Sequence, residues 1–280
     1  MPTLGIIGGS GLYELSGIAA TEEVTVETPY GPPSDAVVRG RIGDTTLLFL
    51  PRHGRGHRLP PGAINYRANV CAMKKLGATH LVSVSAVGSM KEEIRPGDLV
   101  IVDQFVDLTK RRISSFFESG IAAHVGLADP VCPQLAEATA RAAAKAGARF
   151  HRGGTYVCIE GPQFSTRAES RIYRSWGVSV IGMTNMPEAK LAREAELPYA
   201  TIAVATDYDC WHETQEDVTV DAVIAVLGKS LLVTKRVLAE LAQILPDARK
   251  SPAYGALKNA VLTDKSLISQ AARAELEWLL

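Results

Sequence analysis

The sequence predicts a single α/β domain in which a mixed, mostly parallel β-sheet is flanked by helices and a helical segment closes the chain. Two observations lead to this fold class. Short apolar runs rich in β-branched residues alternate with amphipathic segments over most of the 280 residues, which is typical of strands joined through crossover helices. The length suits one large domain or two small ones, and neither a linker nor an internal repeat divides it.

The apolar runs are predicted strands, and each ends in a loop. In chain order they are Leu4–Gly8, Thr46–Leu50, His80–Ser85, Leu99–Val102, Tyr156–Ile159, Val178–Ile181 and Ala200–Ala205. Thr21–Glu27 and Val37–Ile42 predict an antiparallel pair around a Pro-Tyr-Gly-Pro turn. The amphipathic segments between and after these strands are Asn65–Leu76, Val131–Ala146, Arg167–Trp176, Glu188–Ala195, Val220–Ile244 and Asp264–Leu280.

The domain organisation follows from where the strands stop. We expect residues 1–245 to form the α/β domain, because the last predicted strand and the helix after it lie within this range. We expect residues 246–280 to form a helical extension packed on the same domain.

Charge and cysteine usage exclude several classes of protein. The 30 Lys and Arg residues balance 30 Asp and Glu residues, which argues against nucleic acid or an anionic membrane as a partner. No run approaches the roughly 20 apolar residues of a membrane span, and the N-terminus lacks the basic segment of a secretory signal. The cysteines are far apart and predict reduced, mostly buried thiols in a cytoplasmic protein; they are Cys71, Cys132, Cys158 and Cys210.

Ligands of open α/β sheets bind at the carboxyl ends of strands, so polar residues at these ends are candidates. After the first strand, Gly8-Gly9-Ser10-Gly11 offers backbone N–H groups and a hydroxyl to an anion, although a plain tight turn explains it about as well. The loop after Thr46–Leu50 carries five cationic or titratable groups: Arg52, His53, Arg55, His57 and Arg58. Such groups fit one small phosphate, and a solvated basic loop is the alternative.

Two further strand ends offer walls for a planar ligand. Ala86-Val87-Gly88-Ser89 supplies small residues and backbone donors, or serves packing alone. Phe164, just before a predicted helix, is placed to stack on an aromatic ring. Ser165 or Thr166 fits the N-cap of that helix with Glu169 completing a capping box, so these hydroxyls also have a structural explanation.

The pair Asp207 and Asp209 directly follows the apolar strand Ala200–Ala205. Two carboxylates one residue apart at a strand end can point into the same cleft. Paired carboxylates separate their pKa values, so one can stay protonated and act as an acid while the other accepts a hydrogen bond. A metal site and an ordinary Asx turn are the alternatives.

Together these segments resemble the trimeric nucleoside phosphorylases over roughly the first nine-tenths of the chain. The motifs that carry the resemblance are Ile6-Ile7-Gly8-Gly9-Ser10-Gly11, Arg52-His53-Gly54-Arg55, Asn65-Tyr66-Arg67-Ala68-Asn69, Arg95-Pro96-Gly97-Asp98, Ile159-Glu160-Gly161-Pro162-Gln163-Phe164-Ser165, Met183-Thr184, Pro187-Glu188 and Ala205-Thr206-Asp207-Tyr208-Asp209-Cys210-Trp211. The resemblance implies a mixed-sheet α/β fold and a homotrimer with active sites near the subunit interfaces. It also implies an enzyme, a pentosyltransferase, that needs neither a metal nor an organic cofactor and uses inorganic phosphate as co-substrate.

The resemblance assigns roles to individual residues. The implied phosphate ligands are Ser10, Arg52, His53, Ser85, Ala86 and Thr184. The implied nucleoside contacts are Val87, Gly88, Phe164, Ser165, Met183, Thr206, Asp207, Asp209, His124, Val220, Val223 and Ile224. Among these, Asp207 and Asp209 are the catalytic, adenine-reading pair. His124 is lent by a neighbouring subunit to an apolar 5′ pocket.

The reaction that these roles imply is phosphorolysis of 5′-methylthioadenosine to adenine and 5-methylthioribose 1-phosphate. Phosphate held beneath C1′ stabilises and captures an oxocarbenium-like sugar, while a protonated Asp207 assists the leaving adenine at N7. An ionised Asp209 accepts from the 6-amino group. Val87 and Gly182 depart from the residues frequent in relatives, which are Cys and Asn at these positions.

Three other functions compete with this interpretation. A phosphorylase of 6-oxopurine nucleosides, such as methylthioinosine or inosine and guanosine, is the nearest, and Asp207 and Asp209 argue against it. A hydrolase of the same nucleosides would use water, which the Arg52-His53 cluster disfavours. A non-catalytic nucleotide-binding protein on this fold is the third, because fold alone does not determine function.

Overall fold

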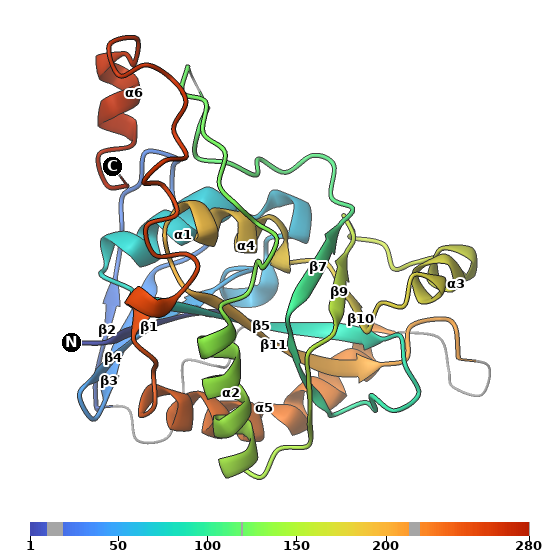
Figure 1. Ribbon diagram of the computed structural model, residues 1–280. Helices are drawn as coiled ribbons and strands as arrows, with labels where there is room; N and C mark the ends of the chain where they lie inside the picture. The colour runs from blue at the N-terminus through green and yellow to red at the C-terminus, as the bar shows by residue number, and fades with distance from the viewer. Residues whose placement is uncertain (10–18, 119, 213–218, 280) are drawn as a thin grey trace.

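The computed structural model describes residues 1–9, 19–118, 120–212 and 219–279. Within these ranges the strands form one sheet with helices on both faces (Figure 1). The strands are β1 Thr3–Gly8, β2 Ala19–Val24, β3 Val37–Ile42, β4 Thr45–Pro51, β5 His80–Ser89, β6 Leu99–Val102, β7 Gln104–Asp107, β8 Phe150–Arg152, β9 Thr155–Cys158, β10 Val180–Gly182 and β11 Tyr199–Asp207. The α-helices are α1 Tyr66–Lys75, α2 Pro133–Lys145, α3 Arg167–Ser175, α4 Asn185–Glu194, α5 Val220–Ala242 and α6 Gln270–Glu275.

The sheet is mixed and mostly parallel, as the sequence predicts. Its main order is β2-β3-β4-β1-β5-β10-β9-β7, with β11 beside β5 and β6, and β8 beside β6. The parallel pairings are β1–β4, β1–β5, β5–β11, β6–β8, β7–β9 and β9–β10. The pairings β2–β3, β3–β4, β5–β10 and β6–β11 are antiparallel. The predicted antiparallel excursion near the N-terminus is therefore confirmed as β2 and β3.

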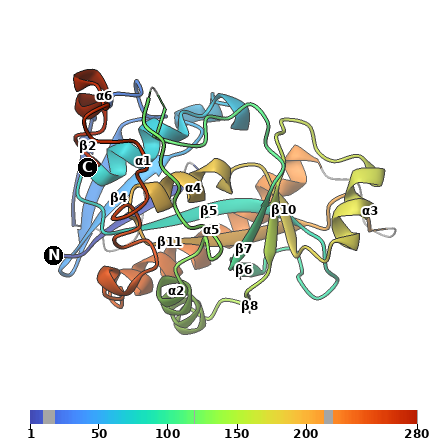
Figure 2. The same ribbon diagram turned by 45° about the horizontal axis from the view of Figure 1, so that its top comes forward.

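Both faces of the central strands are covered, which explains why β1 is a continuous apolar run. Helices α1 and α4 lie on one face, and α2 and α5 lie on the other (Figures 1 and 2). Ile7 belongs to the same buried cluster as Met73 of α1, whereas its neighbour Ile6 belongs to a second cluster with Leu135 of α2 and Leu238 of α5. Successive side chains of a strand point to opposite faces, so adjacent isoleucines serve two separate cores.

Some predicted boundaries differ from the structure. Strands β7 and β8 were not predicted, because they have only four and three residues, are not fully buried and form no continuous apolar run. The C-terminal helix is shorter than Asp264–Leu280: it begins after Ser269, whose side chain accepts from the Ala272 N–H, and it ends at Glu275. Beyond it, Trp278 packs edge-on against Phe116 with ring centroids 4.9 Å apart. In the part of the chain that is described, no helix is long and apolar enough to cross a membrane.

The parallel strands β1, β4, β5 and β11 end at one edge of the sheet, and this edge positions the candidate site. Gly8 pairs with Pro51, and Ala205 pairs with Val87. A register shift between Ala205 and Asp207 then marks a β-bulge in β11. Bulges re-aim side chains at the ends of strands, so Asp207 leaves the ladder at the point where the loop begins.

A close approach inside the sheet gives the first testable prediction. A Cβ atom built on Gly182 would lie 2.0 Å from the Tyr156 hydroxyl oxygen, so no larger residue fits without displacing that ring. We expect Gly182→Ala to lower the free energy of unfolding by about 1–3 kcal/mol through overpacking. Urea unfolding of the purified protein measures this loss.

The matched control for this prediction is Gly228→Ala in α5, where no described atom outside the adjacent residues and the nearby helix backbone lies within 4 Å of the added Cβ. Alanine is favoured over glycine in a helix interior by about 1 kcal/mol, so this variant should be more stable than the parent chain. Equal stability of Gly182→Ala and the parent would contradict the close approach to Tyr156.

Candidate active site

The edge where β1, β4, β5 and β11 end brings together residues that are far apart in the sequence. Arg52 and His53 follow β4, Thr184 precedes α4, and Asp207 ends β11. Ser85 lies within β5, which is longer than the predicted strand and continues to Ser89. Ser10, the predicted phosphate ligand after β1, lies outside the described residues. The other predicted phosphate ligands take part in two arrangements: a buried ion pair and a cluster of hydroxyl groups.

The Arg52 guanidinium points under the strand ends, where its side chain is 2% exposed. Its Nε donates to Glu188 Oε2 at 2.9 Å, and its Nη2 lies 3.1 Å from Glu188 Oε1, so the pair is bidentate. The same guanidinium donates to the Ile7 and Val84 carbonyl oxygens and to Ser83 Oγ. Arg52 therefore fastens β1, β4 and β5 to α4 beneath the candidate phosphate site. Glu188 belongs to the Pro187-Glu188 motif, but its ion pair with Arg52 is a tertiary contact that the sequence alone does not predict.

His53 follows this ion pair in the chain and is neutral near neutral pH. Burial lowers the pKa of His53 to about 4. Its Nδ1 is 2.8 Å from the Leu59 carbonyl oxygen, and its ring stacks on that of His57 at 4.1 Å. A carbonyl oxygen only accepts, so in neutral His53 the hydrogen is on Nδ1 and Nε2 has a free lone pair.

A hydroxyl cluster occupies the next position along the edge. Ser85 Oγ lies 3.1 Å from Thr184 Oγ1 and 3.2 Å from the Tyr156 hydroxyl oxygen. Thr184 is the N-cap residue of α4 and its side chain makes no capping hydrogen bond. Its hydroxyl thus faces Ser85. Met186 has non-helical dihedral angles (φ −114°, ψ 131°), so the regular part of α4 begins after that residue. Tyr156 was not among the predicted site residues.

Asp207 is held in an arrangement that suits a protonated carboxyl group. Thr206 Oγ1 lies 2.6 Å from Asp207 Oδ2 and 3.2 Å from the Val87 carbonyl oxygen. A hydroxyl has one hydrogen and a carbonyl only accepts, so both contacts are hydrogen bonds when Thr206 donates to Val87 and Asp207 Oδ2 carries a proton. Burial of the Asp207 carboxyl raises its pKa, which favours the same protonation state.

Asp209 is buried beside Asp207 and has different partners. Its backbone N–H donates to Asp207 Oδ1 at 2.8 Å, and its Oδ2 accepts from Ser170 Oγ at 2.5 Å. Burial raises the pKa of Asp209, and the hydrogen bond from Ser170 opposes that shift. A Cβ on Gly88 would lie 2.9 Å from Asp207 Oδ1, so only glycine lets β5 approach the two carboxyl groups this closely.

The loop before α3 supplies the other predicted base contacts. Phe164 is 47% exposed, which is unusual for a large aromatic side chain unless it faces a partner or ligand. Ser165 Oγ is buried and has no hydrogen-bond partner among the described residues, and the Ser165 carbonyl oxygen accepts from Cys210 Sγ at 3.3 Å. Thr166 and Glu169 form the predicted capping box, which fixes the start of α3.

Comparison with known proteins identifies the group to which this arrangement belongs. Residues 3–243 match the sequence profile of the phosphorylase superfamily. The chain belongs to that superfamily. It is 54% identical to the S-methyl-5′-thioadenosine phosphorylase of Geobacter sulfurreducens, covering 99% of this chain and 97% of the relative. It is 52% identical to the enzyme of the same name from Koribacter versatilis, covering 99% and 95%.

Solved structures of the superfamily are also similar. The crystal structure of a methylthioadenosine phosphorylase from an Antarctic soil metagenomic library has a TM-score of 0.95 and 48% identity, covering 100% of this chain and 99% of that chain. The methylthioadenosine phosphorylase of Schistosoma mansoni in complex with adenine has a TM-score of 0.87 and 36% identity, covering 94% and 99%. The predicted fold class and the resemblance to nucleoside phosphorylases are thereby confirmed.

Arg112 organises the site of this phosphorylase-superfamily chain, and the sequence analysis missed it. Its side chain is 1% exposed and forms an ion pair with Glu160. It donates to the carbonyl oxygens of Met183, Met186 and Glu160, each at 2.7 Å. Arg112 thus joins the segment of Met183 and Thr184 to the loop that leads to Phe164. The signal in the sequence was a Lys-Arg-Arg run shortly after a strand that was itself too short to predict.

The predicted 5′-pocket residues lie on α5 and on the connection between β7 and α2. Val220 and Ile224, on the first turns of α5, are 61% and 60% exposed, and Val223 between them is half-buried. His124 is exposed in the long connection between β7 and α2, and its backbone N–H donates to the Ala260 carbonyl oxygen at 2.9 Å.

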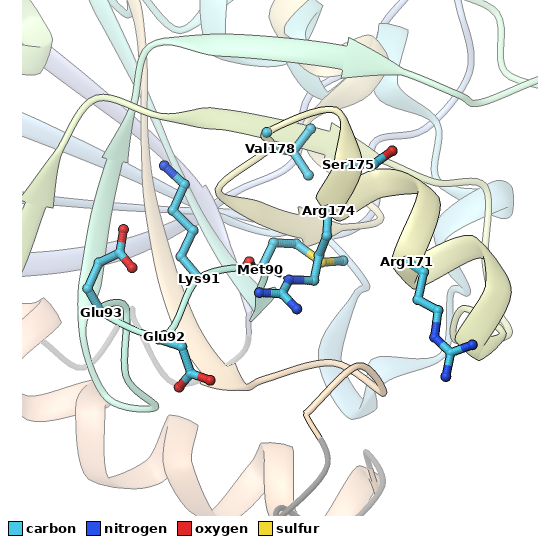
Figure 3. A pocket seen from close by; sticks show the side chains of 9 residues that line it. Met90, Lys91, Glu92, Glu93, Arg171, Arg174, Ser175 and Val178 are labelled. Atoms are coloured by element: carbon cyan, nitrogen blue, oxygen red, sulfur yellow. Dashed lines mark hydrogen bonds between the residues drawn. The ribbon is translucent and has the colours of Figure 1, made fainter.

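A surface hollow of about 590 Å³ lies beside α3, and none of the predicted site residues line it. Its lining is Met90, Lys91, Glu92, Glu93, Arg171, Arg174, Ser175, Gly177 and Val178 (Figure 3). Arg174 lies over the Trp211 ring at 3.6 Å and donates to the Met90 carbonyl oxygen. Lys91 and Arg171 point in different directions (Figure 3), so these two cationic side chains do not converge on one ligand position. Among the described residues, no three His, Cys, Asp or Glu side chains are grouped to hold a metal ion.

The ion pair beneath the site gives the second prediction. Arg52→Met leaves the Glu188 carboxylate buried without its cation, and we expect a loss of about 3–5 kcal/mol in the free energy of unfolding. Combining Arg52→Met with Glu188→Leu should recover part of this loss, because neither charge then remains buried. Urea denaturation of the single and double variants measures both effects.

The control is an ion pair of similar length at the surface. Arg39 and Glu22 are 2.8 Å apart, with side chains 37% and 58% exposed. Arg39→Met should change the free energy of unfolding by less than about 1 kcal/mol. A loss at Arg52 no larger than that at Arg39 would contradict the structural role of the buried pair.

Proposed function

We propose that the chain is a pentosyltransferase that cleaves 5′-methylthioadenosine with phosphate, giving adenine and 5-methylthioribose 1-phosphate. The observation that carries this proposal is the pair of carboxyl groups of Asp207 and Asp209, partly or fully buried at the edge that also holds Ser85 and Thr184. The relatives that are 54% and 52% identical over nearly the whole chain are both named S-methyl-5′-thioadenosine phosphorylase, which supports the same reaction.

The two carboxyl groups read the base. In its protonated form Asp207 donates to N7 of the purine, and in its ionised form Asp209 accepts from the 6-amino group. A 6-oxo group in that place would bring two sets of lone pairs together. A buried site with the wrong hydrogen-bond polarity discriminates between substrates by orders of magnitude, so this pair favours adenine.

Phosphate binds where the hydroxyl groups and the basic loop meet. Ser85 and Thr184 donate to its oxygens, together with the backbone of Ala86 and with Ser10. Arg52 provides positive charge from below, and the neutral His53 accepts through Nε2 the hydrogen that the monoprotonated phosphate carries. The Arg52 bonds to Glu188 and the strand carbonyls hold this charge in a fixed place before phosphate arrives.

In the reaction one bond breaks and one forms at C1′ of the ribose. The C1′–N9 bond breaks as the Asp207 proton passes to N7, so adenine leaves neutral rather than as an anion. A phosphate oxygen forms the new bond to C1′, and its negative charge stabilises the developing oxocarbenium ion beforehand. The hydrogen of the phosphate is released to solvent, from which Asp207 regains its proton. No metal or organic cofactor is needed for these steps.

The 5′-methylthio group fits an apolar pocket completed by a second copy of the chain. Val220, Val223 and Ile224 provide its walls, and the exposure of Val220 and Ile224 in the single chain supports a partner at this place. His124 is exposed and reaches the pocket of a neighbouring copy. We infer a homotrimer on this basis, and the free cysteine thiols fit a cytoplasmic location.

The domain boundaries are part of the same proposal. Residues 1–245 form the catalytic α/β domain, and residues 246–280 pack on it as an extension. The Ala123–Val261 bridge and the Ala260–His124 hydrogen bond support this arrangement, because they tie the extension to the connection that carries His124.

A substrate panel gives the third prediction. With phosphate present, we expect the order of kcat/KM to be methylthioadenosine above adenosine, with methylthioinosine and inosine both lower by roughly 100-fold or more. In rigorously phosphate-free buffer, release of adenine should stop. Chromatography of the released base, with and without phosphate, measures both results.

Each competing function gives its own result in this panel. Faster cleavage of the 6-oxo nucleosides would identify a 6-oxopurine phosphorylase. Undiminished adenine release without phosphate would identify a hydrolase. Nucleoside binding by calorimetry with no product under either condition would identify a non-catalytic binding protein.

The role of Asp207 gives the fourth prediction. Asp207→Ala removes the acid and should lower kcat/KM about 100- to 10,000-fold. In the parent enzyme the rate should fall as the pH rises through the pKa of Asp207, because the acid must carry a proton, and burial moves this fall above the ordinary range of aspartate. The alkaline fall should be absent from the residual rate of the variant.

Asp44→Ala is the control, because Asp44 is exposed in the turn between β3 and β4. It should leave the rate and the pH profile unchanged. A parent-like rate in Asp207→Ala would mean that the leaving base is activated by another group.

A further inference from the structure

Ser170 has no role in the function proposed so far, yet it directly contacts the residue that reads the base. It lies in the first turns of α3, is fully buried, and its Oγ is 2.5 Å from Asp209 Oδ2. A serine hydroxyl facing a carboxylate can donate only one hydrogen bond, so this bond directs its single hydrogen at Asp209. Cys210 is the other hydrogen-bond partner of this carboxyl group, through its backbone and through its thiol, which lies 3.9 Å from Asp209 Oδ2.

The position of Ser170 is set by the helix and not by the loop that precedes it. The Ser170 N–H donates to the Thr166 carbonyl oxygen at 3.0 Å, in the first turn of hydrogen bonds of α3. Thr166 and Glu169 bond to each other through the capping box, so the backbone hydrogen bonds of this turn are satisfied without the Ser170 hydroxyl. The hydroxyl is therefore available for Asp209, and it is held on a rigid element.

We propose that Ser170 is a positioning residue that sets the base specificity of the site by holding Asp209 as an ionised acceptor with Oδ1 turned to the 6-position of the purine. This inference rests on the proposed function, in which Asp209 reads the 6-amino group. It adds a residue outside the predicted nucleoside contacts and explains how two neighbouring aspartates take opposite protonation states.

The groups around Asp209 explain why a donor is needed. Burial and the nearby Asp207 both raise the pKa of Asp209 and so favour its neutral form. Tyr173 of α3 and the Cys210 thiol are the other titratable groups that face it, and both are neutral near neutral pH. Arg167, the cation beside Cys210, donates to the Cys210 carbonyl oxygen. Hydrogen bonds from Ser170 and from Cys210 lower the pKa of Asp209, and the Ser170 hydroxyl contributes the largest part of this effect.

The protonation state of Asp209 decides which base it accepts. An ionised carboxylate only accepts hydrogen bonds, so it binds an amino group and repels a 6-oxo group. A protonated carboxyl group can donate, so it tolerates a 6-oxo oxygen. Loss of the Ser170 hydroxyl should therefore weaken adenine recognition and relax the discrimination against 6-oxopurines at the same time.

The test compares methylthioadenosine with methylthioinosine in Ser170→Ala, Ser170→Thr, Asp209→Asn and the parent enzyme. A hydrogen bond to a charged group is worth about 1.5–3 kcal/mol, so the ratio of the two kcat/KM values should fall roughly 10- to 100-fold in Ser170→Ala. The acid limb of the methylthioadenosine profile should move to higher pH, because Asp209 without its donor becomes protonated more readily. Ser170→Thr keeps the hydroxyl and should keep the parent ratio.

Ser175→Ala is the matched control. Ser175 lies on the same helix, and its Oγ donates to the Ile172 carbonyl oxygen at 2.6 Å, away from Asp209. This variant should keep both the substrate ratio and the acid limb of the parent. A role of Ser170 in stability alone would lower the two kcat/KM values equally and leave their ratio unchanged.

The outcomes separate this inference from the proposed function. An unchanged ratio and acid limb in Ser170→Ala, with the ratio lost in Asp209→Asn, would overturn the role of Ser170 and leave the base-reading pair in place. A parent-like ratio in Asp209→Asn would overturn the base-reading role of Asp209, and the role of Ser170 with it. A parent enzyme that prefers methylthioinosine would overturn the proposed function itself.

Discussion

The ion pair between Arg52 and Glu188 is the interaction on which the edge of the sheet depends. It lies beneath the strand ends, and the guanidinium also binds carbonyl oxygens of β1 and β5. The Tyr199 hydroxyl donates to Glu188 from β11 at 3.0 Å, so a fourth strand joins the network. Two buried charges are costly unless both are fully hydrogen-bonded, and here these bonds join β1, β5, β11 and the residue after β4 to α4.

This alignment explains how a chain with no net charge builds a strongly polarised site. Under the proposed function, the Arg52 cation lies at the phosphate side, and the carboxyl groups of Asp207 and Asp209 lie at the base side of the same edge. Partial exclusion of water strengthens each of these interactions and also shifts protonation. His53 is driven to its neutral form and Asp207 toward its protonated form by the same cause, which is burial. Proton donors and acceptors are thus defined before any ligand binds.

Much of this was predictable because the parallel strands have a simple pattern. Buried on both faces, β1 and β11 read as continuous apolar runs, and polar residues directly after such runs lie together at one edge. The short strands β7 and β8 gave no such pattern, because only part of each is buried. The contacts of Glu188, Arg112 and Ser170 could not be predicted either, since each joins segments that only the folded chain brings together.

The capping box of α3 illustrates why a structural and a functional explanation need not compete. The sequence predicts a purely structural role for Thr166 and Glu169, which is to cap the helix after Phe164, and the structure confirms this capping box. However, a helix whose first turn is fully capped can spare the hydroxyl of its next serine for another partner. In this fold that partner is Asp209, which lies 39 residues further along the chain, just after β11. If Asp209 reads the base as proposed, the cap thereby links a local sequence preference to the hydrogen-bond polarity of the base site.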